Sequence, residues 1–436
     1  MKMASPAIAG YSSQMIVSVI DTAMVGRIEN ADIILASMGL GVLATWTLTS
    51  FLSSLSTGTH ILIAHRFGES KHAELGDVLK HSLALTFGLG LIFGILFYWL
   101  SYPLMDLLAA DVEVTKYSSE YMQYRAYGLP FFLMGISFRA FYYGIGSTKV
   151  FMYSALISYL VNIIFNYFLI FGNAGFPRMG VAGAGLASSI GMAVGLFVFL
   201  AFSYLPRYRI RYSLLRWPKF MAEEFLRIVR LSLPVSFQNI LILFGFLLFV
   251  SITGLIGTVE QAATQVVITA LYVSFMPCFG FGVAAQTLVG NALGNKQPQL
   301  AYIQALETTQ LAIIFTSVIG FFFVGFTENT LSILTNNTIV IETATPILRL
   351  VGIAQVFYGA GIVLSSALQG AGETVFVMKL EIVTHWILFL PISYLLAVST
   401  SFGLMGAWIA MPLYVIAYTG ISYVKLRSGS WKKNRL

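Results

Sequence analysis

Asp21 is the first residue of this chain that could do chemistry, because it is an acid inside an apolar segment. The segment reads SPAIAGYSSQMIVSVIDTAMVG, and Arg27 closes it. A carboxylate is costly in hydrocarbon, so such an acid usually faces a protein interior or a wet cavity and marks an ion or proton path. The segment holds no Lys or Arg, and Gln14 lies two turns earlier on the same face. We therefore expect a functional acid; the alternative is a structural acid that caps a polar gap or pairs with a base.

Two other sets of charged residues lie in apolar runs. Glu381 and His385 are four residues apart and share a helical face, but Glu381 follows Lys379 near a cytoplasmic end. We expect an interfacial acid and a histidine with satisfied hydrogen bonds there. Arg139 lies roughly 15 Å along a helix from the nearest polar end, too deep for easy contact with the membrane surface. The charge of Arg139 could be balanced by a structural partner, by an anionic substrate or by Asp21.

Composition defines the class of protein. The 436 residues are 58% hydrophobic and 10% charged, with a mean hydropathy of +0.83, whereas a soluble domain carries about 25% charged residues. Apolar runs long enough to cross a bilayer recur from end to end. Backbone groups in lipid must be satisfied internally, so we predict an all-α polytopic membrane protein. The single cysteine, Cys278, excludes an intramolecular disulfide and a cysteine-based metal cluster, and we expect no metal site and no cofactor.

The net charge of +7 is unevenly distributed, which argues against a nucleic-acid partner. Basic residues gather at 65–80, in the segment 205–230 and at the C-terminus, while the alternate loops carry mainly acids. This is the positive-inside pattern, and it places both termini and the long linker in the cytoplasm. The linker is also suited to contact anionic membrane lipid. Its basic residues are Arg207, Arg209, Arg211, Arg216, Lys219, Arg227 and Arg230.

The apolar runs predict twelve transmembrane helices in two six-helix bundles. We expect a first bundle in 1–204, a basic linker in 205–226, a second bundle in 227–426 and a basic tail in 427–436. The expected helices are 4–26, 34–63, 79–102, 118–144, 150–173, 180–204, 227–257, 262–290, 301–326, 343–369, 375–399 and 403–426.

The two halves repeat one another. RAYGLPFF at 125–132 is echoed by RLVGIAQVF at 349–357, and YYGIGSTK at 142–149 by LQGAGET at 368–374. Three further matches, HRFG with NALG, MGVAGAGLA with FGLMGAWIA, and Pro6 with Pro234, share nearly the same shift. Matches in one order at a near-constant shift indicate a duplication. Parallel repeats with the substrate path between them are typical of transporters.

At these motifs the chain resembles the multidrug and toxic compound extrusion (MATE) family. The resemblance covers essentially the whole chain. It rests on VIDTAMVGRI, LSTGTHILIAHRFGES, YYGIGSTK, NIIFNYFLIFG, GVAGAGLA, FMPCFGFGVAAQTLVGNALG and LQGAGET in this order. It implies two bundles related by a pseudo-two-fold axis that open alternately to either side, with efflux driven by inward H⁺ or Na⁺.

The acids that are present favour a DinF-like rather than a NorM-like member. NorM-like members place a Glu in helix 7 and an Asp in helix 10, but here those positions fall near Ile242 and Tyr358. In DinF-like and archaeal members an Asp of helix 1 works with polar residues of helices 5 and 6. The matching positions, which we take as the cation-coupling site, are Asp21, Asn162, Asn166 and Ser188.

Two coupling ions remain open at this site. Asn162 and Asn166 are four residues apart and share one helical face. A proton site needs one acid whose affinity for a proton is increased by burial, and Asp21 with neutral amides fits. A Na⁺ site needs about five or six oxygens, which the four side chains and backbone carbonyls could supply. The absence of a second acid weakens a Na⁺ site more, so H⁺ is favoured. The alternatives are helix–helix hydrogen bonding by the amides and close packing at Ser188.

The resemblance implies a multi-pass protein of a bacterial inner membrane that exports cationic or amphipathic organic compounds, and we expect a monomer. Aromatic and sulfur side chains could hold planar cations. A lipid-linked oligosaccharide flippase of the same superfamily is the alternative, but its cavity should be rich in Arg and Lys. An enzyme is not expected, because no H-E-x-x-H, C-x-x-C or phosphate loop is present. A channel suits the duplication less well. The expected substrate cavity contains Gln14, Met24, Arg139, Phe357 and Tyr358.

Overall fold

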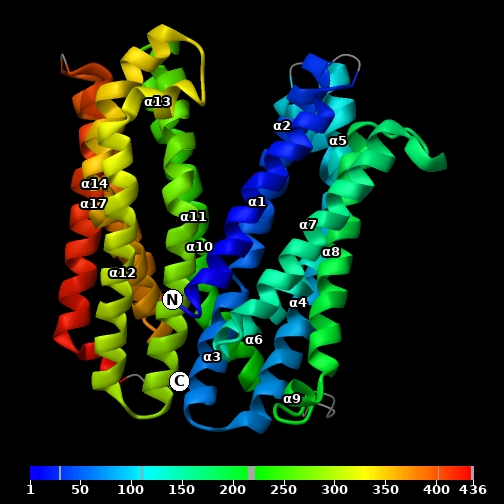
Figure 1. Ribbon diagram of the computed structural model, residues 1–436, viewed down its shortest axis with the longest axis vertical. Coiled ribbons are helices and arrows are strands. Elements are labelled where there is room, and N and C mark those ends of the chain that lie inside the picture. The colour runs from blue at the N-terminus through cyan, green and yellow to red at the C-terminus, as the bar shows by residue number, and fades with distance from the viewer. Residues whose placement is uncertain (29–30, 110, 215–220, 401, 434–436) are drawn as a thin grey trace. The chain divides into compact units, whose positions relative to one another are not determined.

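The computed structural model describes residues 1–28, 31–109, 111–214, 221–400 and 402–433. Over these residues the chain is helical and contains no strand (Figure 1). It divides into two compact units, Met1–Ser232 and Leu233–Leu436, and the division falls inside one long helix. Arg216 and Lys219 of the predicted basic linker lie outside the described residues.

The first unit is a helical bundle that ends with the first turns of α10. Its long helices coincide with the expected spans, although two of those spans are broken into two helices each. The helices are α1 (Ala4–Val25), α2 (Ala31–Ser53), α3 (Ser56–Gly68), α4 (Leu75–Leu108), α5 (Val112–Ala126), α6 (Leu129–Gly144), α7 (Thr148–Phe171), α8 (Val181–Tyr204) and the start of α10 (Ala222–Gly254), with the short η1 (His72–Glu74), η2 (Asn173–Gly175) and α9 (Pro206–Arg209).

The second unit repeats the bundle plan. Its eleventh expected span, 375–399, consists of an α-helix, a π-helix and a second α-helix in succession. The elements are the rest of α10, α11 (Thr258–Gly294), α12 (Pro298–Gly325), α13 (Thr327–Ser332), α14 (Thr338–Gly370), α15 (Thr374–Glu381), η3 (Ile382–Phe389), α16 (Leu390–Val398), α17 (Gly403–Ser428) and η4 (Ser430–Lys433).

Among the described residues, 11 helices are long and apolar enough to cross a membrane. The remaining expected span, 118–144, is divided into α5 and α6, of 15 and 16 residues. Pro130 at the start of α6 lacks an N–H and suits the first turn of a helix. A Cβ atom on Gly90 of α4 would lie 2.6 Å from the Pro130 Cα, so α4 packs against this break at close range. The prediction of an all-α polytopic fold is confirmed.

Small residues bring α7 and α8 together. Ser154 and Ser158 of α7 donate hydrogen bonds to the carbonyl oxygens of Gly195 and Gly191 of α8, at 2.8 Å and 2.6 Å. A Cβ atom on Gly183 would lie 2.7 Å from the Leu169 backbone. The glycine- and alanine-rich run of α8 therefore packs against α7, as small residues do between membrane helices. This close packing sets the positions of the polar residues on both helices.

The core of the second unit is a large apolar cluster. It contains Phe249 of α10, Phe389 of η3 and Trp408 of α17. The centroid of the Phe249 ring lies 4.9 Å from that of Phe389 and 5.0 Å from that of Trp408. Helices α12 and α14 also approach closely, since a Cβ atom on Gly320 would lie 2.4 Å from the Gly352 carbonyl oxygen. A few polar side chains are enclosed by this apolar packing.

Candidate functional site

The structure brings the four predicted coupling residues of the first unit into one cluster. Asn166 donates a hydrogen bond from Nδ2 to Oδ1 of Asp21 at 2.6 Å. Asn166 also approaches Asn162, and Asn162 approaches Ser188, each at 3.4 Å. Asn162 and Asn166 are buried, while Asp21 is half-buried. Helices α1, α7 and α8 thus place one carboxyl group among two amides and a hydroxyl.

A second orientation of the Asn162 amide strengthens this cluster. When the amide is turned over, its nitrogen donates to Oδ1 of Asp21 and its oxygen accepts from the Ser188 backbone N–H, both at 3.2 Å. Asp21 then accepts hydrogen bonds from both asparagines. The Oδ1 atom of Asn166 has no hydrogen-bond partner among the described residues. The cluster therefore has oxygen atoms available to a small cation.

Arg125 is a member of this cluster that the sequence did not single out. Its Nη1 donates to the Tyr121 hydroxyl at 2.8 Å and to Ser188 Oγ at 3.3 Å. Its positive charge attracts the Asp21 carboxylate, but the described residues show no direct ion pair between the two. The signal was present, because Arg125 begins the repeated RAYGLPFF motif inside an expected span. The site is therefore a carboxylate with a cation nearby, and Ser188 links that cation to Asn162.

Three of the predicted cavity residues lie in the first unit, away from this cluster's hydrogen bonds. Gln14 is exposed, and Met24 packs beside an apolar core. Arg139 lies with its guanidinium 5.7 Å from the centre of the Phe151 ring. The hydroxyl groups of Tyr11, Tyr143 and Tyr159 also act on its charge. Arg139 is thus held by aromatic residues, whereas the cation that acts on Asp21 is that of Arg125.

The other two predicted cavity residues lie on α14 in the second unit. Tyr358 stacks on Phe275 of α11, with ring centroids 4.2 Å apart and planes 23° apart. Phe357 is 40% exposed, and its carbonyl oxygen accepts a hydrogen bond from Thr419 at 2.7 Å. Tyr358 therefore packs against the core of its unit while remaining partly exposed, and Phe357 presents an apolar ring at the surface of its unit.

The structure buries Glu381 and His385, the pair for which the sequence predicted an interfacial acid and a histidine with satisfied hydrogen bonds. Glu381 is 2% exposed and His385 is fully buried. The Nε2 atom of His385 has no hydrogen-bond partner within the described part of the chain, so the histidine is not satisfied as expected. Lys379 indicated a position near the end of the helix. The sequence did not show that tyrosine side chains of the neighbouring α17 cover Glu381 and His385.

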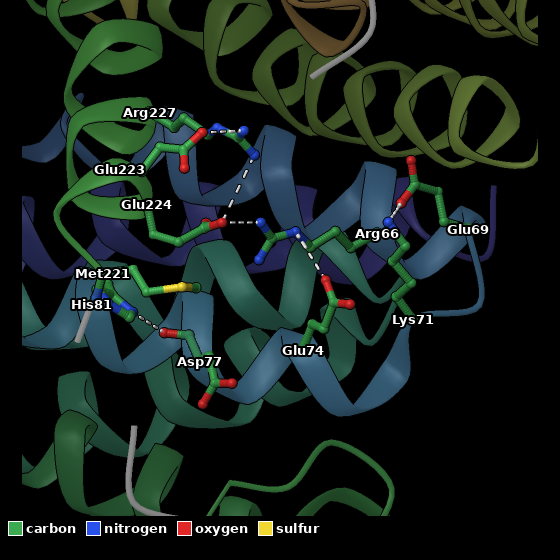
Figure 2. Close-up of polar contacts among 10 residues, drawn as sticks. All are labelled: Arg66, Glu69, Lys71, Glu74, Asp77, His81, Met221, Glu223, Glu224 and Arg227. Carbon is green, nitrogen blue, oxygen red and sulfur yellow. Dashed lines mark hydrogen bonds and ion pairs between the residues drawn. The ribbon is translucent and has the colours of Figure 1, made fainter. Parts of the chain in front are cut away.

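A second polar cluster joins α3, η1, α4 and the start of α10 (Figure 2). Arg66 of α3 pairs directly with Glu224 of α10, and both side chains are largely buried. Glu74 lies 3.7 Å from Arg66, and Arg227 lies 3.8 Å from Glu224. Ser232 Oγ accepts from the Gly58 N–H at 2.9 Å and donates to the Leu55 carbonyl oxygen. The first turns of α10 are therefore fixed to the first unit.

Comparisons with known proteins agree with this architecture. The MatE family model matches residues 6–168 and 234–395, once in each half. A "Probable multidrug resistance protein NorM" of Thermotoga maritima is 28% identical, covering 99% of this chain and 92% of that protein. A protein of the same name from Idiomarina loihiensis is 26% identical, covering 94% of this chain and 89% of that protein.

Solved structures share the fold. One is described as "Outward-facing conformation of a multidrug resistance MATE family transporter of the MOP superfamily", with a TM-score of 0.87 and 20% identity over 99% of this chain and 96% of that chain. A MOP superfamily transporter from Pyrococcus furiosus gives a TM-score of 0.89 at 20% identity over 100% of this chain and 96% of that chain. At this identity the likeness concerns the fold alone.

Proposed function

Since this chain belongs to the MatE family, we propose that it exports organic compounds across the membrane in exchange for protons. The chain is a multi-pass membrane protein, and its relatives are transporters rather than enzymes. The names of those relatives support multidrug efflux, and they do not favour a flippase. The finer parts of the proposal are the coupling ion, the residues that bind it and the class of substrate.

One observation carries the choice of coupling site. Asp21 is held by the Asn166 amide at 2.6 Å, in a cluster that α1, α7 and α8 form together. A carboxyl group with neutral hydrogen-bond donors can alternate between a charged and a protonated form, because each form has partners. Loss of the Asp21 charge weakens the hydrogen bond from Asn166, since bonds to charged acceptors are roughly twice as strong as neutral ones. Protonation would then free α1 to repack against α7 and α8.

Arg125 supports H⁺ over Na⁺ as the coupling ion. A Na⁺ ion at Asp21 would lie close to a permanent guanidinium, and the two like charges would repel. A proton that binds to Asp21 leaves a neutral carboxyl group, so it adds no positive charge beside Arg125. Unlike Na⁺, it also needs no coordination shell of about six oxygens. The Arg125 charge then remains with Ser188 and Tyr121 as its partners.

The transport cycle follows from this switch. A substrate enters from the cytoplasm or the inner leaflet and binds to apolar and aromatic walls. After the carrier opens outward, a proton from outside neutralises Asp21, and repacking of α1 narrows the cavity and expels the substrate. The carrier then returns inward and releases the proton. Cationic or amphipathic organic compounds suit such walls, with Gln14, Met24, Arg139, Phe357 and Tyr358 as the proposed contacts.

The remaining parts of the proposal concern subtype and location. The acid on α1, with amides on α7 and none of the acids of NorM-like members in helices 7 and 10, supports a DinF-like coupling arrangement. The basic segments support cytoplasmic termini in a bacterial inner membrane. We propose that the transporter acts as a monomer in contact with membrane lipid.

Separate ion gradients test this proposal. Ethidium is added outside everted membrane vesicles that contain the protein, where the cytoplasmic face is exposed, and either a pH gradient or a Na⁺ gradient is imposed alone. The pH gradient should drive ethidium transport, and the Na⁺ gradient at equal pH should not. Vesicles without the protein are the control. Transport driven by Na⁺ alone would overturn proton coupling at Asp21.

A further inference from the structure

A buried polar cluster in the second unit lies apart from the proposed coupling site. Oε1 of Glu381 accepts a hydrogen bond from the Tyr414 hydroxyl at 2.8 Å and lies 3.1 Å from Nδ1 of His385. Glu381 ends α15, His385 lies in η3, and Tyr414 lies on α17. Both titratable residues are within the apolar core, where an ionisable group marks a functional site by default.

The net charge of this cluster depends on whether it binds one proton. Among the described residues, His385 is the one basic group within ion-pair distance of Glu381. The titratable groups that face Glu381 from other helices are Tyr414 and Tyr418 of α17 and Tyr358 of α14. Tyrosines are neutral near pH 7. Without an added proton the cluster therefore carries one buried negative charge, and with one added proton it is neutral.

Burial strongly favours the neutral state. An isolated ionised carboxylate inside a protein is costly, and no Lys or Arg offsets it at ion-pair distance in the described residues. One proton removes that cost, whether it lies on the imidazole as an ion pair or on the carboxyl beside a neutral ring. The Tyr414 hydroxyl can donate to Glu381 in either case. The geometry thus suits one proton shared by two groups.

The surroundings of His385 are unusual in their helix type and in their packing. The π-helical turns of η3 are of a kind that is frequently found at functional sites. Nε2 of His385 is buried and has no hydrogen-bond partner in the described residues. It faces Gly245 of α10, where a Cβ atom would lie 2.3 Å away. The ring nitrogen therefore packs against the glycine backbone, in the space that a side chain at residue 245 would fill.

Polar side chains lead away from this cluster. Tyr418 lies next to Tyr414 with ring centroids 5.9 Å apart, and it hydrogen-bonds to Gln238 and Ser365. Gln238 in turn accepts from Gln369 at 3.3 Å, and Gln369 lies at the end of α14. The polar groups therefore continue through the apolar core from the cluster towards one end of the bundle.

We propose that Glu381 and His385 form a proton-binding site in the carboxy-terminal half, with Tyr414 as a positioning residue. A proton from water adds to the pair, changes its charge from −1 to zero, and leaves when water regains access. This site is separate from Asp21 and goes beyond the proposed antiport, because proton binding here does not depend on any exported substrate.

Infrared difference spectroscopy tests the site directly. The purified full-length protein in a lipid bilayer is taken from about pH 5 to about pH 9, on either side of the reference pKa of a free imidazole. The wild-type difference spectrum should contain a carboxylic C=O or an imidazolium ring band that is lost in both Glu381→Gln and His385→Gln. Glu342→Gln, which changes an exposed acid on α14, should leave this band in place. Spectra of both variants that superimpose on the wild type would overturn the site.

A milder variant, Tyr414→Phe, gives a second test in case Glu381→Gln or His385→Gln fails to fold. This variant keeps both titratable groups and removes only the hydrogen bond to Glu381, so the proton band should shift in frequency rather than disappear. An unshifted band contradicts the role of Tyr414. The spectra need no transport, so failure of ethidium efflux would count against the proposed function and leave this result unaffected.

Discussion

At the scale of single residues, the proposed coupling site depends on how Asp21 is held. The sequence identified Asp21 by its depth in an apolar segment, and the resemblance to DinF-like members pointed to Asn162, Asn166 and Ser188. It did not identify Arg125, because an Arg near the start of an expected span resembles an interfacial residue. Contact between Arg125 and Ser188 requires the packing of α5 against α8, which no spacing along the chain reveals.

Replacing the main hydrogen-bond donor of Asp21 should weaken coupling. Asn166→Ala removes the 2.6 Å bond to Asp21, and a hydrogen bond to a charged group contributes about 1.5–3 kcal/mol. We therefore expect pH-driven ethidium transport to fall by roughly tenfold or more. Asn173→Ala, which removes a bond to the Tyr167 carbonyl oxygen, is the matched control and should transport normally. Wild-type rates for Asn166→Ala at equal protein abundance would exclude this role.

At the scale of helices, the start of α10 is attached to the first unit by charge and by close packing. The sequence predicted a basic linker up to residue 226 and a helix from 227. The helix begins earlier, at Ala222, and its first turns carry Glu223 and Glu224, which meet Arg227 and Arg66 (Figure 2). Net charge alone could not reveal these acids as partners, because they are a minority within a basic segment.

Glu224→Gln should destabilise the protein much more than Glu223→Gln. Within the described part of the chain, the first change leaves the largely buried Arg66 with the more distant Glu74 as its one acidic partner, and removing one partner of a buried pair costs about 3–5 kcal/mol. The second change affects a side chain that is 76% exposed, so little should change. Thermal unfolding of the detergent-solubilised variants, followed by size-exclusion chromatography, measures the difference. Equal melting temperatures would show that the ion pair does not fix α10.

Gly58 offers a steric test of the same attachment. A Cβ atom on Gly58 would lie 2.3 Å from the Ile228 carbonyl oxygen, so Gly58→Ala must push α10 away from α3 and lower the melting temperature. Gly88→Ala on α4 is the control, because its Cβ atom meets nothing within 4 Å. An alanine there should stabilise the helix by about 1 kcal/mol. If the two variants melt alike, α3 and α10 are not in close contact.

At the scale of the whole molecule, the sequence predicted the architecture better than it predicted the individual sites. The lengths of the apolar runs predicted nearly all of the long helices, and the repeated motifs predicted two halves. The breaks between α2 and α3 and between α5 and α6, and the π-helical turns of η3, were not predicted. The burial of Glu381 was also missed, since it arises from tyrosines of α17 that lie more than thirty residues further along the chain.

The coupling role of Asp21 is tested by a substitution that removes its titratable group and keeps its shape. Asp21→Asn and the control Asp106→Asn, which changes an exposed acid on α4, are reconstituted in everted vesicles at equal abundance, and ethidium transport is measured under an imposed pH gradient. Asp21→Asn should abolish pH-driven transport, and Asp106→Asn should retain it. Wild-type transport by Asp21→Asn would contradict the account.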